Sequence, residues 1–217
     1  MRVLSVDPQN PAPAAVCEAA DALARGAIVA FPTDTLYGLA VDPRNESAVD
    51  RLYVVKGRAS DQPLPLIAAD DHQVATQAGT LSELARALAA EFWPGPLTLI
   101  VPAHPALCAR VHASTGRVAV RVPAHATARA LARAAGHPIT ATSANTSGGT
   151  PASTGEQVRA VLDKSVDLLL DAGPTIGGLP STIVDATGST PELVRAGAVP
   201  WERVLRSVRC RPPTGVS

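Results

Sequence analysis

The sequence predicts an α/β protein, one domain built on a twisted, open, mixed parallel and antiparallel sheet with flanking helices. Segments with helical and with strand spacing alternate over residues 14–208 without a repeat, and no linker-like change in composition interrupts them. The 217 residues are 46% hydrophobic and 18% charged, which suits one core without disulfides or a structural metal. We therefore expect one domain over residues 1–208 and a flexible tail over residues 209–217.

The first two elements predicted are a helix and a buried strand. Residues 14–25 place Val16 and Leu23 on one helical face, and Gly26 stands where such a helix would end. The apolar run at 27–31 then predicts a strand inside the core. A helix that leads directly into a buried strand is typical of α/β domains.

Later segments continue this alternation. Thr80 and Glu83 have the spacing of a capping box and predict the start of a helix. Leu84, Leu88 and Phe92 share one face of that helix. The other elements expected are, in chain order, a helix at 46–55, strands at 97–101 and 118–122, a helix at 126–135, a strand at 138–142, a helix at 155–162, strands at 166–170, 182–185 and 192–195, and a last amphipathic helix from Pro200.

The lengths of the connections predict a mixed sheet. Strands joined through a helix favour parallel pairing, because the crossover returns the chain to the same end of the sheet. The strands after residue 166 follow one another closely, which favours antiparallel additions. We expect both kinds of pair.

Composition excludes several classes of protein. The formal net charge is zero, which argues against a protein that mainly grips long nucleic acid, although a local basic cavity remains compatible with it. Cys17, Cys108 and Cys210 lie far apart without CxxC spacing, so we expect neither a disulfide framework nor a zinc site. No apolar run reaches the length of a membrane span, and the N-terminus lacks a signal-peptide core. We expect a cytoplasmic protein that does not bind membranes.

Polar residues follow the first buried strand at its carboxyl end, where open α/β sheets bind ligands. Thr33, Asp34 and Thr35 come directly after Phe31 and Pro32. These side chains could bind a ligand, or they could satisfy the amides of a local turn. The residues alone leave both interpretations open.

A second polar segment places Lys56, Gly57 and Arg58 at the end of the predicted helix at 46–55, with Gln62 shortly after. The two cations could complement the helix dipole. They could also bind an anion, because arginine offers a planar fork for phosphate or carboxylate and lysine a compact charge.

A third segment, residues 140–150, is rich in small hydroxyl and amide side chains and ends in glycines. Such a loop could surround phosphate groups with N–H and hydroxyl donors, or it could be a flexible connector. Ser153, three residues before Glu156, could cap the next helix. The sequence contains no GxxxxGK[ST], GxGxxG or GxSxG motif.

Taken together and in this order, these segments resemble the YrdC/Sua5 family, the threonylcarbamoyl-adenylate synthases. The matching stretches are FPTDTLYGL (31–39), KGR (56–58), FWPGPLTLIV (92–101), VAVRVP (118–123), TSANTSGGTP (142–151) and STIVDAT (181–187). They extend over about residues 14–200. The resemblance implies a twisted mixed sheet around a large, positively lined concave site.

The resemblance also implies a reaction. L-threonine and bicarbonate (or CO2) give N-carboxy-threonine, which attacks the α-phosphate of ATP to form threonylcarbamoyl-AMP and pyrophosphate. The product then serves the modification of the adenosine beside the anticodon of tRNA. The resemblance further implies that the product is passed to a tRNA threonylcarbamoyl-transferase complex. It leaves open whether this chain also makes a weak direct contact with tRNA.

By resemblance, the site residues fall into three overlapping sets. The residues expected to carry catalysis are Lys56, Arg58, Ser143 and Asn145. The ATP-binding residues are these four together with Gln62, Ser153 and Arg195. The threonine-binding residues are Thr35, Arg121, Ser143 and Ser181. Mg²⁺ is expected with ATP, held by phosphates and water, and no protein ligand to it is assigned.

The sequence departs from the family pattern at several places. Gln62 stands where the family often has Asn, and Ile67 stands where a histidine often contacts threonine. The chain ends near residue 217 and resembles the short type without the extra C-terminal domain. We therefore expect loops such as 142–151 to close the site.

Two other functions fit parts of the pattern. Related domains handle carbamoyl-adenylate in carbamoyl-transfer enzymes, and threonine dependence of ATP turnover would separate the two activities. A noncatalytic RNA-binding or ribosome-maturation factor could use the same concave surface. Zero net charge and the lack of an aromatic stacking platform count against this second alternative.

Overall fold

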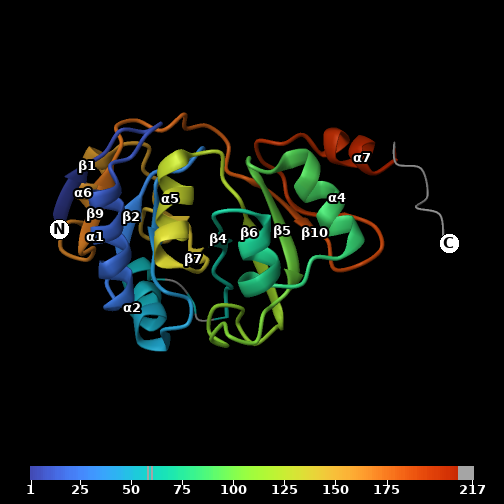
Figure 1. The fold of residues 1–217 in the computed structure, drawn as a ribbon, viewed down its shortest axis with the longest axis horizontal. Helices are drawn as coiled ribbons and strands as arrows, with labels where there is room; N and C mark the ends of the chain where they lie inside the picture. Colours follow the sequence, from blue (N-terminus) through green and yellow to red (C-terminus); the bar gives the residue numbers. More distant parts are fainter. Residues whose placement is uncertain (58, 60, 210–217) are drawn as a thin grey trace.

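The computed structural model of the chain describes residues 1–57, 59 and 61–209, and Figure 1 shows its fold. The helices are α1 (Pro13–Ala24), α2 (Glu46–Lys56), α3 (Asp71–Gln73), the π-helical turn η1 (Val74–Ala78), α4 (Glu83–Phe92), α5 (Ala126–Ala135), α6 (Gly155–Leu162) and α7 (Trp201–Arg209). The strands are β1 (Arg2–Ser5), β2 (Val29–Phe31), β3 (Gly38–Ala40), β4 (Leu66–Ile67), β5 (Leu97–Pro102), β6 (Arg117–Arg121), β7 (Ile139–Thr140), β8 (Thr142–Ser143), β9 (Leu168–Asp171), β10 (Thr182–Asp185) and β11 (Glu192–Arg195). The α/β class is confirmed. Within the described residues, no helix combines the length and apolarity needed to span a membrane.

The strands are divided between two sheets, a division that the sequence did not predict. One sheet has the order β1-β9-β2-β3-β8, and the other has the order β11-β10-β5-β6-β4-β7. Hydrophobic periodicity locates strands but carries no information on non-local partners such as β1 and β9. Of the tail expected over 209–217, Arg209 ends α7 and residues 210–217 lie outside the described residues.

The two sheets meet at Ala141, between β7 and β8. Thr140 pairs with Leu66 in the six-stranded sheet, whereas Ser143 pairs with Gly38 in the five-stranded sheet. The N–H of Ala141 donates to the carbonyl of Pro65 at 2.8 Å. The segment predicted as one strand at 138–142 is therefore shared by both sheets.

Both predicted kinds of strand pairing occur. β10 lies parallel to β5 and antiparallel to β11, which confirms the antiparallel addition expected near the C-terminus. The expectation is wrong for β9, which lies parallel to β1 and β2. The chain from α6 reaches β9 by a helical crossover of the kind that produces parallel pairs.

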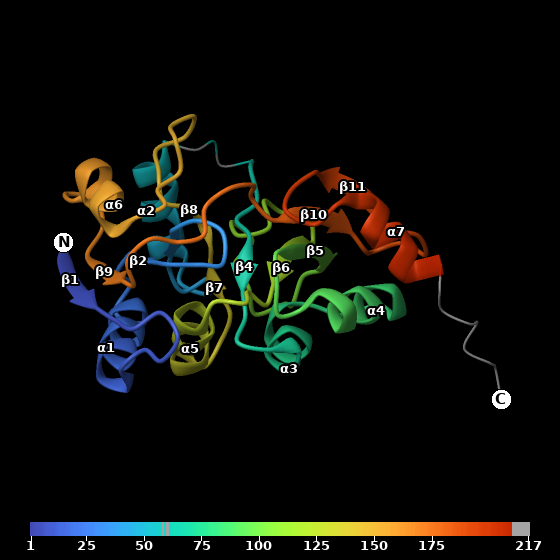
Figure 2. The same ribbon diagram turned by 90° about the horizontal axis from the view of Figure 1, so that it is seen from above.

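Helices form a layer along one side of both sheets. Figure 2 shows α1, α5, α3 and α4 along this side, with α2 and α6 on the other side of the five-stranded sheet. Leu97, Leu99 and Val120 of the six-stranded sheet are fully buried in one core with Leu88 of α4. Because side chains alternate along a strand, Thr98 and Arg121 face away from α4. That second face of the six-stranded sheet carries part of the candidate site.

The predicted capping box of α4 is wrong. The N-cap is Ser82, whose Oγ accepts a hydrogen bond from the N–H of Ala85 at 3.0 Å. The N–H of Thr80 donates to the carbonyl of Pro102 at 3.0 Å, so Thr80 is still bonded to the last residue of β5 and precedes the helix. Ser82 Oγ also donates to the carbonyl of Ala186 at 2.9 Å and thus joins α4 to the end of β10.

Ser82→Ala should lower the free energy of unfolding by about 1–2 kcal/mol, because it removes a helix cap and one hydrogen bond. Thr80→Ala, the matched control at the residue first expected to cap this helix, should change it by less than about 0.5 kcal/mol. Urea unfolding followed by circular dichroism measures both. A larger loss in Thr80→Ala than in Ser82→Ala would contradict the assignment of the cap.

Candidate functional site

Lys56 forms the centre of the first part of the candidate site. It is the last residue of α2, which ends at Gly57 in the left-handed conformation (φ 58°). The Lys56 side chain is almost fully buried, and its Nζ donates to the carbonyls of Ser143 and Asn145 at 2.6 Å each. Nζ also donates to Asn145 Oδ1 at 2.7 Å. Three acceptors match the three N–H donors of an ammonium group, so this buried charge is well compensated.

The loop after β8 is ordered by these contacts. Ser143 Oγ donates to Asn145 Oδ1 at 2.6 Å, and Asn145 Nδ2 donates to the carbonyl of Gly149. The N–H of Ser147 donates to the carbonyl of Lys56 at 2.8 Å. Of the two interpretations of residues 140–150, a flexible connector is therefore wrong for 143–149. The positive charge of Lys56 lies directly beneath a turn rich in hydroxyl groups and backbone N–H groups.

The turn after β2 forms a second part of the site. Thr33 Oγ1 accepts hydrogen bonds from the N–H groups of Thr35 at 3.2 Å and Leu36 at 3.3 Å. Thr35 Oγ1 lies 3.1 Å from Thr33 Oγ1, and both side chains are buried. This part of the segment is the self-satisfied turn that the sequence suggested.

Asp34 projects from this turn to Arg121 on the other sheet. Arg121 Nη1 lies 2.7 Å from Asp34 Oδ1, and both side chains are more than nine-tenths buried. Asp34 Oδ2 accepts from the N–H of Ala124 at 3.2 Å, and Arg121 Nη2 donates to Thr33 Oγ1 at 3.3 Å. Burial lowers the pKa of Arg121, and the negative charge of Asp34 opposes that shift. The ion pair fixes the guanidinium plane at the end of β6.

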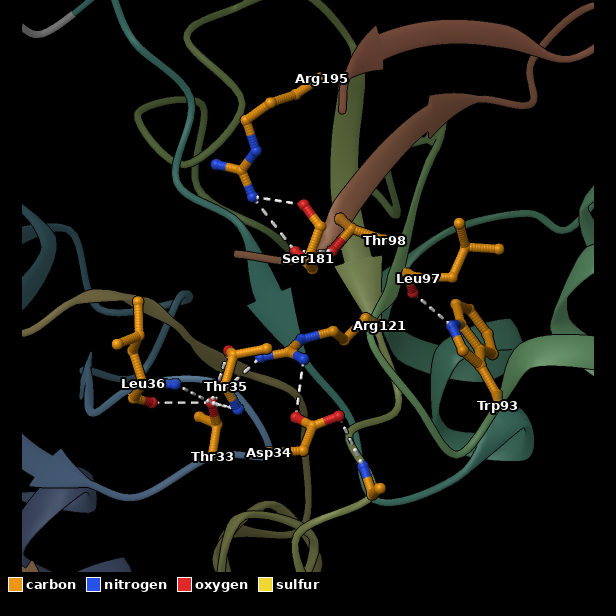
Figure 3. Close-up of polar contacts among 11 residues, drawn as sticks. Thr33, Asp34, Thr35, Leu36, Trp93, Leu97, Thr98, Arg121, Ser181 and Arg195 are labelled. Carbon is orange, nitrogen blue, oxygen red and sulfur yellow. Dashed lines mark hydrogen bonds and ion pairs between the residues drawn. The ribbon is translucent and has the colours of Figure 1, made fainter. Parts of the chain in front are cut away.

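Arg195 and Ser181 form the third part, shown with the second in Figure 3. Arg195 Nη2 donates to the carbonyl of Ser181 at 2.8 Å and to its Oγ at 3.2 Å. The hydroxyl groups of Ser181 and Thr98 lie 2.8 Å apart. Burial lowers the pKa of Arg195, and the positive charge of Arg121 lowers it further. The two positive charges therefore disfavour each other, and an anion bound by both arginines would offset that effect.

The segment between β9 and β10 holds these parts together. Tyr37 Oη donates to the carbonyl of Gly173 at 2.7 Å, where this segment begins. Further along, the N–H of Thr175 donates to the carbonyl of Ser153 at 2.8 Å, and the N–H of Gly177 donates to the carbonyl of Thr35 at 2.9 Å. Gly177 and Gly178 have φ values of 70° and 86°, which favour glycine. The segment therefore crosses from one sheet to the other over the predicted site residues.

Most of the predicted site residues are placed in these three parts. Arg58 lies outside the described residues. Gln62 is exposed, and its carbonyl accepts from Tyr53 Oη at 2.7 Å. The expected Ser153 cap of α6 is wrong, because the N-cap is Thr154 and Ser153 instead bonds to the side chain of Gln157. The helix begins one residue later than the Ser153–Glu156 spacing suggests.

Three residues of this arrangement were not assigned to the site from the sequence. For Thr33 and Asp34 the sequence left open whether they bind a ligand or only shape their turn, and Thr98 was not singled out. A threonine between Leu97 and Leu99 is a polar residue on the alternate face of an apolar strand, which was the available signal for Thr98. The contact between Asp34 and Arg121 joins residues 87 positions apart and has no local signal.

The donor set of the site suits an anion rather than a bare metal ion. Among the described residues, no group of three or more His, Cys, Asp or Glu side chains could hold a metal. The carboxylate of Asp34 is already paired with Arg121. The three parts carry guanidinium, hydroxyl and amide groups, which are of the kind that binds phosphate and carboxylate groups.

These features define an α/β protein with a candidate anion-binding site between two sheets, and comparison with known proteins identifies its family. Residues 21–197 match the Sua5/YciO/YrdC family model, which is described as "Telomere recombination". The chain belongs to this family.

Named relatives and a solved structure agree with that assignment. The threonylcarbamoyl-AMP synthase of Bacillus subtilis is 42% identical over 190 residues, which are 87% of this chain and 55% of the relative. The synthase of Vibrio vulnificus is 40% identical over 178 residues, which are 81% of this chain and 95% of the relative. The structure of Pyrococcus abyssi Sua5 complexed with L-threonine has a TM-score of 0.90 and 34% identity, and it covers 96% of this chain and 61% of that one. The chain thus spans only a little over half the length of some relatives, such as the Bacillus subtilis synthase.

Lys56→Met should lower the free energy of unfolding by about 2–4 kcal/mol, because three buried oxygen acceptors lose a charged donor. Lys164→Met, at the other lysine of the chain, changes an exposed side chain and should have little effect. Urea unfolding measures both variants. Hydrogen exchange at the Ser147 amide should also accelerate in Lys56→Met; equal stability and equal exchange in the two variants would contradict the role of Lys56 in ordering the loop.

Proposed function

We propose that this chain is a threonylcarbamoyl-AMP synthase. The amine of L-threonine adds to the carbon of CO2 or bicarbonate, with loss of water in the second case, to give N-carboxy-threonine. A carboxylate oxygen of that group forms a bond to the α-phosphorus of ATP, and pyrophosphate leaves with the electrons of the broken P–O bond. The observation that carries this proposal is that the buried Arg121 and the more exposed Arg195 both lie beside hydroxyl groups, Arg121 with Thr33 and Arg195 with Ser181.

ATP would lie along the Lys56-ordered loop and Arg195. Ser143 and Asn145 would exchange hydrogen bonds within the loop for contacts with phosphate oxygens, close to the charge of Lys56. Because Lys56 Nζ already has three oxygen acceptors, it would act through its field and by holding the turn, while Arg58 would supply direct contact. Ser153 and Gln62 would contribute at the edge of the nucleotide. Mg²⁺ would arrive with the ATP phosphates.

L-threonine would lie between the turn after β2 and the end of β6. Arg121 would bind its carboxylate, with Asp34 holding the guanidinium plane from behind. Thr35 and Ser181 would bind the remaining polar groups. Ile67 is fully buried and is the register partner of Arg121 in the parallel pair β4–β6, so both side chains lie on one face of the sheet. An aliphatic side chain would therefore border the threonine pocket where the family often has a histidine.

The product would pass to a protein complex that transfers the threonylcarbamoyl group to tRNA. Transfer by a partner is expected because an acyl-phosphate anhydride reacts readily with water. Such a product is better delivered directly than released. A weak contact of this chain with tRNA belongs to the same proposal, as does cytoplasmic location.

The decisive experiment measures pyrophosphate release from ATP, Mg²⁺ and bicarbonate with each of the twenty amino acids in turn. Release that requires L-threonine is expected. Release with carbamoyl phosphate and without an amino acid would instead identify a carbamoyl-transfer enzyme. Absence of release under every condition, with folded protein, would reject the synthase and favour an RNA-binding role.

Arg121→Lys should raise the KM for threonine about tenfold or more, because a single ammonium cannot replace bidentate pairing with a carboxylate. The KM for ATP should change much less. Arg51→Lys, at an exposed arginine paired with Asp167, is the matched control and should leave both constants unchanged. Steady-state pyrophosphate assays measure these values, and an equal rise of both KM values in Arg121→Lys would contradict its assignment to threonine.

A further inference from the structure

A second cavity lies between helices α4 and α5, outside the candidate active site. Its volume is about 710 Å³, which is in the range of small-molecule binding sites. Ala89 and Ala90 of α4 line it, and their small side chains leave space between the helices. Figure 2 shows α4 and α5 on the same side of the sheets, away from β11, the edge strand that carries Arg195.

One wall of this cavity is apolar and rigid. Trp93, Pro94, Leu81 and Val122 line it. The indole Nε1 of Trp93 donates to the carbonyl of Leu97 at 2.7 Å, so the polar atom of the ring is satisfied and the ring is held in place. A fixed and partly exposed indole offers a surface on which a planar apolar group can stack.

The other wall carries an excess of positive charge. Arg86 comes from α4, and Arg129 and Arg133 lie one helical turn apart on α5. Arg133 Nη2 lies 3.6 Å from Asp70, a partly exposed pair. Asp71 also lines the cavity, and its Oδ1 accepts from the N–H of His72. In the part of the chain that the structure describes, neither Arg86 nor Arg129 has an ion-pair partner, so three cations face two carboxylates.

The cavity is separated from the candidate active site by the end of β6. Val122 lines the cavity and follows Arg121 directly in the chain. Side chains alternate along extended backbone, so the two residues point to opposite sides. The carbonyl of Val122 accepts from the N–H of Gly95 at 2.8 Å, which holds this backbone against the Trp93–Gly95 turn. None of the three site parts described above contributes a lining residue.

We propose that this cavity binds a small aromatic anion, whose ring stacks on Trp93 and whose acidic group pairs with Arg86 and Arg129. An apolar wall with a few convergent polar groups is the usual composition of a ligand site. Two arginines without carboxylate partners supply the fork that carboxylate, phosphate and sulfonate groups accept. This binding does not depend on the proposed synthase reaction, so either proposal can be wrong while the other holds.

The test uses 8-anilinonaphthalene-1-sulfonate as an aromatic anion and N-phenyl-1-naphthylamine as its uncharged counterpart. In a Trp201→Phe background, Trp93 is the remaining tryptophan of the chain. The sulfonate should quench Trp93 emission saturably with one site per chain. The uncharged compound should bind at least about tenfold more weakly, the scale of one charge-assisted hydrogen bond.

Variants locate the bound probe. Arg86→Ala combined with Arg129→Ala should weaken sulfonate binding about tenfold or more, and Ala90→Phe, at an exposed position of α4, should abolish it by filling the cavity. The control pair Arg25→Ala and Arg159→Ala, at exposed arginines elsewhere, should bind like the parent protein. Urea midpoints verify that each variant is folded.

Three outcomes would overturn the proposal. Equal affinity for the charged and uncharged probes would show simple apolar adsorption. Unchanged binding in the double arginine variant or in Ala90→Phe would place the probe elsewhere. Displacement of the probe by ATP together with L-threonine would show that it occupies the candidate active site instead.

Discussion

The buried ion pair between Asp34 and Arg121 joins the two sheets at the point where the candidate site is built. Asp34 follows β2 of one sheet, and Arg121 ends β6 of the other. A buried charge is costly without its partner, so each side chain requires the other to be in place. The pair therefore fixes the distance between the sheets at the site, and the positions of Thr35 on one side and Ser181 on the other depend on that distance.

Local signals predicted much of the secondary structure. Helices α5 and α6 and strands β10 and β11 have the boundaries expected from sequence, because apolar spacing and flanking residues such as Gly136 mark them clearly. The short strands β1, β3 and β4 were missed, since two to four residues are too few to show a period. The caps of α4 and α6 were misplaced because another serine or threonine was available nearby.

The candidate site was predictable where polar residues follow strands and where a family resemblance could be used. Lys56, Ser143 and Asn145 meet as expected, whereas Ser181 and Arg195, which were assigned to different substrates, are bonded to each other. Which atoms of these residues bond to one another was not predictable. Lys56 was expected to face a triphosphate, whereas its ammonium group is enclosed by oxygen atoms of the chain itself. Burial and non-local pairing decide such details, and neither is encoded in the spacing of a motif.

The segment between β9 and β10 touches both proposed substrate regions through its backbone, at Thr35 and at Ser153. A ligand that moved one end of this segment would alter the free energy of ligand binding at the other end. The occupancies of the two regions are then energetically linked. Thermodynamic linkage is reciprocal, so any factor by which the nucleotide tightens amino-acid binding is also the factor by which the amino acid tightens nucleotide binding.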